Sequence, residues 1–350
     1  MSISIRILKA NHGDCILVTH HANDTVFHLL IDGGNGATFK YGPRGRFKGA
    51  LCSMLDELKA KGQHIDLAIL THIDDDHIGG LLSAFKDPGY LNDMVKSIWF
   101  NSSRLITKHF KENEIPENDI YLSDDSPLTS VRQGKKFESL LDEIGCKRGP
   151  LISAGKVMNE GPFKLTILSP NEENLRKLLC IWPEEKSSPQ TSGSTTDYIL
   201  TFEEILSSDS YEPDKSIANG SSIAFLLQCK NKNLLFLGDA YDETVVDSLI
   251  NLGYNEDNKL STELVKISHH GSQYNTSPKL IKIIDAQSYI ISTNGLKHGL
   301  PNKRTIARLL ALSRGIVYFN YPSVIQRMLL SDEVNEYAGR LKVLDDEIRY

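Results

Sequence analysis

The sequence predicts an α/β fold in which two sheets pack face to face and helices cover their outer sides. Apolar runs of strand length recur along the chain, and most are rich in Ile, Leu and Val. The early runs come in a cluster, and helical patterns lie between the later ones. Because this order differs from the regular alternation of a doubly wound sheet, we expect stacked sheets with helices outside.

The predicted strands are short apolar runs with few polar residues, which is typical of sheets covered by other layers. In chain order they are Ile3–Leu8, Cys15–Thr19, Val26–Ile31, Leu67–Leu70, Ser97–Phe100, Leu165–Leu168, Ile223–Gln228, Leu234–Leu237, Leu264–Ile267, Tyr289–Ser292 and Val317–Asn320. Apolar residues at helical spacing, opened by proline or polar residues, predict helices at Gly49–Lys59, Phe137–Ile144, Ser277–Ile284 and Arg304–Leu312.

The chain of 350 residues is expected to form a single domain, 1–350, that carries two insertions. The first, at about 101–150, is polar and charged. The second, at about 183–218, contains the Ser/Pro/Thr-rich stretch 183–196, which is typical of a mobile loop, and then acidic segments.

Charge and cysteine usage exclude several classes of protein. The net charge of −6 argues against a strong non-specific nucleic-acid binder, although bound metal ions attract phosphate locally. The five cysteines include no C-x-x-C pair, which disfavours a disulfide scaffold and favours a reducing, cytoplasmic setting. Neither a signal-peptide pattern nor a run of about 18 apolar residues occurs, so we expect no association with a membrane.

Candidate metal ligands directly follow several of the predicted strands. Because chain segments that leave one end of a sheet aim their side chains into a common crevice, these groups are expected to meet. Together they offer enough nitrogen and oxygen atoms for two metal ions. In chain order they are Asp32, His72, Asp74, Asp76, His77, Asp239, His269 and His270.

The densest group lies in Thr71–Gly80, which reads T-H-I-D-D-D-H-I-G-G. On an extended backbone the alternate residues His72, Asp74 and Asp76 face one side, and a helix is expected to begin at the two glycines. This arrangement assigns His72 and Asp74 to one ion, and Asp76 and His77 to the other. The competing interpretation is a solvated acidic turn that caps a helix.

The run resembles the H-x-H-x-D-H signature of the metallo-β-lactamase superfamily, with Asp74 in place of the second histidine. The form H-x-D-x-D-H is similar to the hydrolase domain of the competence DNA-uptake protein ComEC and its soluble relatives. Other segments resemble that branch in the same order over roughly residues 2–312, with 101–215 mostly outside the pattern. They are Gly13-Asp14, Asp32–Gly34, Asn219–Ser222, Leu237–Asp239, His269–Ser272 and Asn294–Pro301.

The resemblance implies a four-layer αββα sandwich and gives roles to residues outside the central run. Asp239 is expected to bridge the two ions. His269 is expected to be a ligand and His270 to support a ligand or contact substrate, although the division between the two histidines stays open. Asp32 is expected to support the first histidine or its loop through hydrogen bonds instead of binding metal.

Two further motifs have roles that stay open. Asn219, Ser221 and Ser222 either replace the third histidine of better-known relatives or form only a turn that enters a strand. His298 either protonates the leaving group, contacts phosphate or is an ordinary histidine of a surface loop. Among the early histidines, only His12 lies in the first hairpin, close to the expected site.

The expected cofactors are two divalent metal ions, zinc or manganese. Asp74 adds an oxygen ligand where the family signature has imidazole, which suits Mn²⁺ and still permits Zn²⁺. The expected reaction is hydrolysis by a hydroxide that both ions activate. Asp76 and His298 are the predicted catalytic residues, because Asp76 would orient the nucleophile and His298 would protonate the leaving oxygen.

The resemblance implies a phosphodiesterase or nuclease, with nucleic acid or another phosphodiester as the substrate. One alternative is a hydrolase that acts on a small phosphodiester, an ester or an amide. Another is a non-catalytic binding subunit of a bacterial defence or DNA-processing assembly, whose protein partner would dock on the two insertions. The complete set of ligands argues against this last alternative.

A basic loop, Lys40–Lys48, follows the Asp32 motif closely and carries four cations and the aromatic residues Tyr41 and Phe47. It either flanks the site and holds a phosphate backbone or is a solvated surface loop. The sequence favours neither interpretation.

Overall fold

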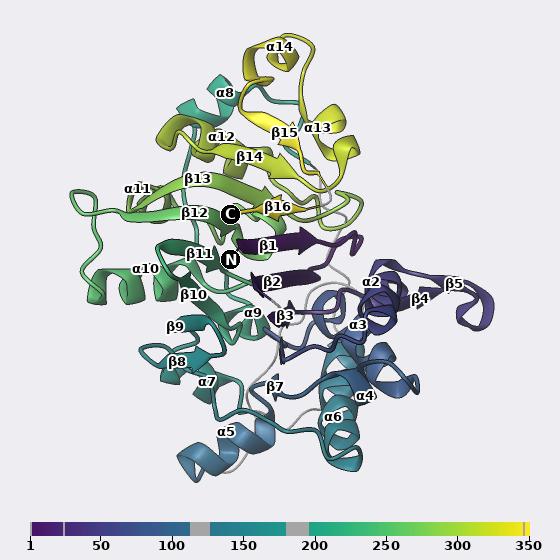
Figure 1. Ribbon diagram of the computed structural model, residues 1–350. Helices are drawn as coiled ribbons and strands as arrows, with labels where there is room; N and C mark the ends of the chain where they lie inside the picture. Colours follow the sequence, from purple (N-terminus) through teal and green to yellow (C-terminus); the bar gives the residue numbers. More distant parts are fainter. Residues whose placement is uncertain (1, 24, 113–126, 180–195, 346) are drawn as a thin grey trace.

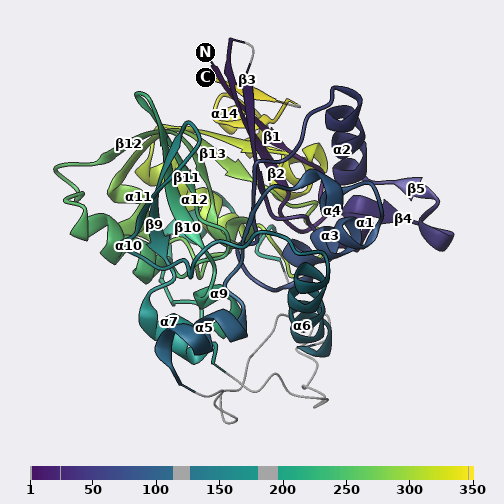
Figure 2. The same cartoon turned by 60° about the horizontal axis from the view of Figure 1, so that its bottom comes forward.

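The molecule has two large sheets at its centre, with helices covering both outer sides (Figures 1 and 2). The computed structural model describes residues 2–23, 25–112, 127–179, 196–345 and 347–350, with the backbone alone described for 127–132. The predicted α/β class with a four-layer αββα order is confirmed.

The first sheet has the strand order β16-β1-β2-β3-β6-β7. β16, β1, β2 and β3 pair antiparallel in this order, whereas β6 pairs in parallel with β3, and β7 with β6. Leu30 of β3 lies opposite Ala68 of β6. Its strands are β1 (Ser2–Ile7), β2 (Ile16–Ala22), β3 (Thr25–Ile31), β6 (Leu67–Ile69), β7 (Ile98–Trp99) and β16 (Ile348–Arg349).

The second sheet has the order β15-β14-β13-β12-β11-β10-β9-β8. The strands from β11 to β15 are parallel, and those from β8 to β11 are antiparallel. Its members are β8 (Val157–Glu160), β9 (Phe163–Ser169), β10 (Ala224–Cys229), β11 (Lys232–Phe236), β12 (Leu260–Lys266), β13 (Ile284–Ile291), β14 (Ile316–Phe319) and β15 (Leu341–Val343).

The core between the sheets follows from the two-residue period of the strands. In β2, Ile16 and Val18 face the second sheet, whereas Leu17 faces the helices. Across the interface, Phe225 of β10 and Leu234 of β11 belong to the same buried cluster as Ile16 and Val18. Alternate residues of the strands therefore bury both faces of each sheet, which requires helices outside.

One group of helices packs on the first sheet, through residues such as Leu55, Phe85 and Phe137. It comprises α2 (Ala50–Ala60), α3 (Asp75–Lys86), α4 (Leu91–Met94) and α6 (Pro127–Glu143). The other group packs on the second sheet, through residues such as Leu249 and Ile306. It comprises α8 (Phe202–Ser207), α10 (Asp242–Asn251), α11 (Pro278–Lys282), α12 (Lys303–Leu312) and α13 (Pro322–Met328).

The remaining elements are short. They are α1 (Gly36–Phe39), β4 (Lys40–Tyr41), β5 (Phe47–Lys48), α5 (Ser103–Phe110), α7 (Glu172–Lys177), α9 (Ile217–Gly220), α14 (Glu333–Tyr337) and the 3₁₀ turns Pro43–Gly45 and Ser268–Gly271. Every predicted strand and helix overlaps an observed one, whereas β4, β5, β8, β15 and β16 were not predicted. These five strands lack a long apolar run of their own.

The helix start predicted at Gly79-Gly80 is wrong, because α3 begins at Asp75, with Asp74 at its N-cap. Carboxylates in the first turn of a helix interact favourably with its positive end, which explains the earlier start. Gly80 instead permits a close approach of backbones. A β-carbon at Gly80 would lie only 2.0 Å from the carbonyl oxygen of Gly33.

The predicted insertions differ in how they join the fold. The segment 101–150 contains α6, whose Phe137 and Leu141 are fully buried in the core of the first helical layer. The Ser/Pro/Thr-rich stretch of the second segment lies outside the described residues, except for its last residue, and so does Cys180. The other four cysteines are free. In the described part of the chain, no helix combines the length and apolarity needed to cross a membrane.

Candidate metal centre

The first part of the site lies where β6 ends and α3 begins. His72 and Asp74 are only 2% and 3% exposed. Asp74 occupies the N-cap position, yet its side chain makes no capping hydrogen bond. Its Oδ2 lies 3.5 Å from Nε2 of His72. The carboxylate therefore faces the histidine, which disfavours the interpretation of this run as a simple helix cap.

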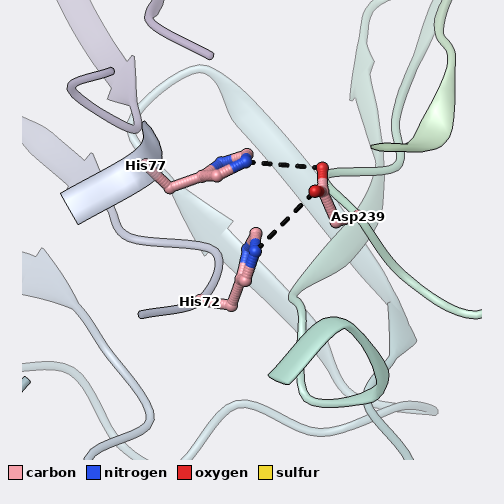
Figure 3. Close-up of side chains that lie close together, drawn as sticks. All are labelled: His72, His77 and Asp239. Atoms are coloured by element: carbon pink, nitrogen blue, oxygen red, sulfur yellow. Dashed lines mark ion pairs between the residues drawn. The ribbon is translucent and has the colours of Figure 1, made fainter. Parts of the chain in front are cut away.

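Asp239 follows β11, and its carboxylate faces both histidines of the central run (Figure 3). Its Oδ2 is 3.8 Å from Nε2 of His72, and its Oδ1 is 3.5 Å from Nε2 of His77. The segment is fixed by the backbone N–H of Asp239, which donates to Oγ of Ser222 at 3.0 Å. A carboxylate that follows a strand of the second sheet thus lies beside candidate ligands that follow a strand of the first sheet.

Asp32 orients His77 from behind. Oδ2 of Asp32 lies 2.8 Å from Nδ1 of His77, and the same carboxylate accepts hydrogen bonds from the N–H and hydroxyl of Thr71. Because a carboxylate only accepts, it selects the tautomer in which Nδ1 carries the proton. This leaves Nε2 of His77 directed at Asp239.

His72 is oriented in a similar way. Its Nδ1 lies 3.1 Å from Oγ1 of Thr71, and this hydroxyl already donates its proton to Asp32. The hydroxyl can therefore only accept from Nδ1 of His72. Nε2 of His72 is again the nitrogen left for another partner.

His270 forms a second group with Asp76 and His77. Its Nε2 lies 3.2 Å from Oδ2 of Asp76 and 3.7 Å from Oδ2 of Asp239. Its Nδ1 donates to the backbone carbonyl of Ser292 at 2.9 Å. A histidine whose Nδ1 bonds a carbonyl presents Nε2 as a ligand, an arrangement common in metal sites.

His269 is held differently, by a polar network on the outer side of Asp239. Its Nδ1 lies 3.0 Å from Oδ1 of Asn275 and 3.6 Å from Oδ2 of Asp214. Asp214 also accepts hydrogen bonds from the side-chain amides of Asn219 and Asn275. Nε2 of His269 is 3.8 Å from Asp239, and the side chain is 22% exposed. His269 is thus the more accessible of the two histidines.

The Asn/Ser motif contributes two of its three candidates. Asn219 reaches Nδ1 of His269 at 3.3 Å, and Oγ of Ser222 lies 3.5 Å from Nδ1 of His72. The hydroxyl of Ser221 instead donates to the carbonyl of Ala218 at 2.6 Å. Ser221 follows the short helix α9 and bonds back to its last turn, so Ser222 is the serine whose hydroxyl contacts the cluster.

The donor set fits divalent metal ions. Nε2 of His72, His77 and His270 and Oδ1 of Asp239 are all buried without a hydrogen-bond partner, although buried polar atoms normally have one. Two atoms bound to one tetrahedral ion at about 2.1 Å lie roughly 3.4 Å apart. The shortest nitrogen–oxygen separations here are 3.2–3.8 Å. Among the described residues, three groups have potential ligand atoms within 4.8 Å of one another: His72/His77/Asp239, Asp76/His77/His270 and Asp14/Asp32/His77.

The electrostatics of the cluster also favour a cation. Burial alone would lower the pKa of His270, but the nearby carboxylates of Asp239, Asp14 and Asp76 raise it to about 10. The pKa of His77 behaves in the same manner. Burial lowers it, but the carboxylates of Asp239, Asp32 and Asp76 raise it well above its ordinary value. The buried carboxylates therefore require positive charge nearby, which either protons or metal ions supply.

His298 lies in the loop between β13 and α12, beside His12. The two rings form an edge-to-face pair with centroids 6.2 Å apart. Burial lowers the pKa of His12 to about 4, against the opposing influence of Asp76. His12 is therefore neutral near pH 7 and lies within electrostatic reach of the cluster. The structure thus brings both loop histidines to this side of the site.

A buried ion pair behind His270 was not predicted. Nζ of Lys266 lies 2.6 Å from Oδ2 of Asp14, with side-chain exposures of 1% and 2%. Oδ1 of Asp14 lies 3.5 Å from Nδ1 of His270. A lysine inside the apolar run Leu264–Ile267 was the available signal for this pair. Asp214 and Asn275 had no comparable signal in the sequence.

The geometry agrees with a comparison of sequences. A family model described as the metallo-beta-lactamase superfamily matches residues 8–134. This range includes the His72–His77 run but neither Asp239 nor His270. The chain is therefore similar to that superfamily over its first part, in agreement with the αββα fold. No curated protein sequence matched the chain.

Several solved structures are similar in fold at low identity. The protein YhfI from Bacillus subtilis is 13% identical, with 91% of this chain and 95% of that chain covered and a TM-score of 0.44. Zn²⁺-bound PqqB from Methylobacterium extorquens is 11% identical, with 99% of both chains covered and a TM-score of 0.39. CmlA, a diiron β-hydroxylase from Streptomyces venezuelae, is 11% identical with a TM-score of 0.42, and this chain spans 54% of its length.

Proposed function

We propose that the protein is a two-metal hydrolase of phosphodiesters, with nucleic acid as its substrate. One observation carries the proposal: three imidazole nitrogens and one carboxylate oxygen converge, buried and without hydrogen-bond partners. His72, Asp74 and Asp239 would hold the first ion. Asp76, His77 and His270 would hold the second, with Asp239 shared between both.

The proposal exchanges the roles first expected for the adjacent histidines. His270 is the buried one, and its Nε2 points at Asp76 and Asp239. His269 is more exposed, and Asp214 and Asn275 hold its Nδ1. We therefore assign the metal-ligand role to His270 and a substrate contact to His269.

Two divalent ions, zinc or manganese, would lower the pKa of a water molecule between them and neutralise charge that develops on the substrate. The residues of the chain prepare the site for this chemistry. Asp32, Thr71 and the carbonyl of Ser292 fix which nitrogen of each histidine is free. Because these partners are already in place, binding requires little reorganisation of the ligands.

Among the carboxylates of the cluster, Asp76 is the one with access to solvent. Its side chain is 16% exposed, against 4% for Asp74 and 3% for Asp239. It is therefore placed to orient the attacking water. His298 retains the proposed role of proton donor to the leaving oxygen. Its ring contacts that of His12, and His12 is close enough to Asp76 for the carboxylate to influence its pKa.

The carboxylate at position 74 supports phosphodiester chemistry over lactam hydrolysis. It adds an oxygen donor to the first site, and oxygen-rich sites favour the hard cations that serve phosphoryl transfer. The same substitution carries the resemblance to the soluble ComEC-type branch, which we retain as part of the proposal. The complete donor set argues against a purely structural subunit.

Cleavage of plasmid and single-stranded DNA with Mn²⁺ or Zn²⁺ tests the proposal. We expect wild-type activity and a loss on the order of 100-fold or more for Asp76→Ala. Asp75→Ala is the matched control, because Asp75 is the neighbouring carboxylate on α3 but accepts from Gln133 at 2.7 Å. It should remain close to wild type.

The outcomes separate the alternatives. Turnover of bis-p-nitrophenyl phosphate without cleavage of DNA would support a hydrolase of small phosphodiesters. No turnover of either substrate, by wild type and Asp76→Ala alike, would contradict an enzymatic role and favour the binding subunit.

A further inference from the structure

The hairpin formed by β4 and β5 projects from the body of the molecule in both views (Figures 1 and 2). Its two aromatic residues are exposed, Tyr41 at 51% and Phe47 at 47%. Their rings lie 5.4 Å apart and are tilted by 30°. Large aromatic side chains rarely remain together at the tip of a projection unless they contact something else.

The charges of the hairpin are all of one sign. Lys40–Lys48 contains four cations and no carboxylate, in a chain whose net charge is −6. Lys40 pairs with Asp87 and Lys48 with Asp56, so both lysines are neutralised at the base of the hairpin. Arg44 and Arg46 are exposed at its tip and form no ion pair with a described carboxylate.

The tip is organised before anything binds. Gly42 has a φ of 78°, and a β-carbon there would lie 2.7 Å from the ring of Phe47, so glycine permits the ring to fold over the turn. The guanidinium carbon of Arg46 lies 5.8 Å from the centre of the Phe47 ring. An ordered aromatic and cationic surface loses less entropy on binding than a flexible loop does.

The hairpin is also tied to the metal centre through backbone. The segment Asp32–Gly34 precedes α1 and the hairpin, and it bonds α3 at two points. Gly33 N–H donates to the carbonyl of His77, and Gly80 N–H donates to that of Gly34. α1 packs against α3, which carries Asp76 and His77. A ligand bound by the hairpin would therefore be held by a segment that packs directly on α3, the helix that carries Asp76.

We infer that this hairpin binds single-stranded nucleic acid, with Arg44 and Arg46 contacting phosphates and Tyr41 and Phe47 stacking on bases. A surface that combines cationic and aromatic groups matches a single strand, which offers both phosphates and exposed base faces. A duplex offers phosphates but hides the faces of its bases. The inference rests on the proposed function and narrows its substrate from nucleic acid in general to single strands.

Fluorescence anisotropy with a labelled phosphorothioate oligothymidylate, which resists cleavage, measures this binding in the full chain reconstituted with metal. We expect Arg44→Ala/Arg46→Ala to weaken binding ~10-fold and to reduce its salt dependence. Tyr41→Ala/Phe47→Ala should weaken single-strand binding by a similar factor and leave duplex binding unchanged. The matched control Arg314→Ala/Arg349→Ala removes two exposed arginines elsewhere and should bind as wild type does.

Turnover of bis-p-nitrophenyl phosphate by the same variants keeps this inference separate from the proposed function. It should stay at the wild-type level, because the small ester does not reach the hairpin. Unchanged oligonucleotide binding in both hairpin variants would overturn the inference while leaving the hydrolase intact. Equal binding of a poly-glutamate peptide would also overturn it, in favour of an acidic protein partner.

Discussion

Nδ1 of His77 lies 2.8 Å from Oδ2 of Asp32, and both side chains are fully buried. Asp32 directly follows β3 and His77 lies in the first turn of α3, so the contact joins the end of a strand of the first sheet to the helix. Through it, one carboxylate determines which nitrogen of His77 faces the proposed metal ions.

Asp32→Asn is therefore expected to weaken metal binding by roughly 10–100-fold, the usual cost of losing a partner that orients a ligand. The amide has the same shape but no longer enforces protonation of Nδ1 of His77. Competition with a chromophoric chelator measures the affinity, with Asp75→Asn as the control. An affinity equal to that of wild type would contradict the role assigned to Asp32.

The adjacent histidines are expected to differ in metal stoichiometry. His270→Asn removes the nitrogen that faces Asp76 and Asp239, so it should reduce the metal content by about one ion per chain. His269→Asn should retain the full metal content and lose activity through substrate contact. Elemental analysis of the two purified variants decides the assignment, and the opposite pattern would restore His269 as the ligand.

The buried pair of Lys266 and Asp14 is expected to be important for stability. Lys266→Met leaves the Asp14 carboxylate buried without its cation, which costs about 3–5 kcal/mol in comparable cases. The control Lys232→Met breaks a more exposed pair with Glu263 and should cost about 1 kcal/mol or less. Urea denaturation measures both, and equal losses in the two variants would contradict the importance of the buried pair.

Asp242 is expected to make stability depend on pH. Burial raises its pKa to about 6, against hydrogen bonds from Ser277 that lower it. A raised folded-state pKa favours the protonated form, so its contribution is complete below the ordinary pKa near 3.8 and is lost as the pH rises towards 6. The side chain at position 242 in Asp242→Asn does not ionise, so this variant lacks the pH-dependent contribution to stability.

The stability of Asp242→Asn relative to wild type should therefore increase between pH 4 and pH 6.5, by roughly 3 kcal/mol for a shift of about two pKa units. Denaturation of both proteins across this range gives the difference. A difference that is constant with pH would show that Asp242 does not titrate in the folded state near pH 6.

Local patterns in the sequence account for the parts that could be predicted. The apolar runs indicate most strands, and the Thr71–Gly80 run places the four predicted ligands within six residues. Asp239 was found because it closely follows a strand. Such patterns involve residues that are close in the sequence, so they can be recognised without knowing which distant segments are in contact.

Contacts between distant segments account for what was missed. Asp214 and Asn275 meet at His269 although 61 residues separate them, and nothing near Asp214 in the sequence marks it. The sequence does not show which of His269 and His270 points its side chain at the metal site, because that direction depends on the local backbone. Both residues have positive φ angles, 46° and 53°. Ser222, and not Ser221, contacts the cluster because Ser221 caps the end of a four-residue helix. The apolar pattern of the sequence does not show this helix.

The central claim is that two divalent ions bind around Asp239. Elemental analysis of the wild-type chain, reconstituted with Zn²⁺ or Mn²⁺ and freed of excess metal, tests it most directly. The arrangement predicts about two ions per chain, falling to one or fewer in Asp239→Asn. Fewer than about one ion per wild-type chain with either metal would contradict a two-metal centre.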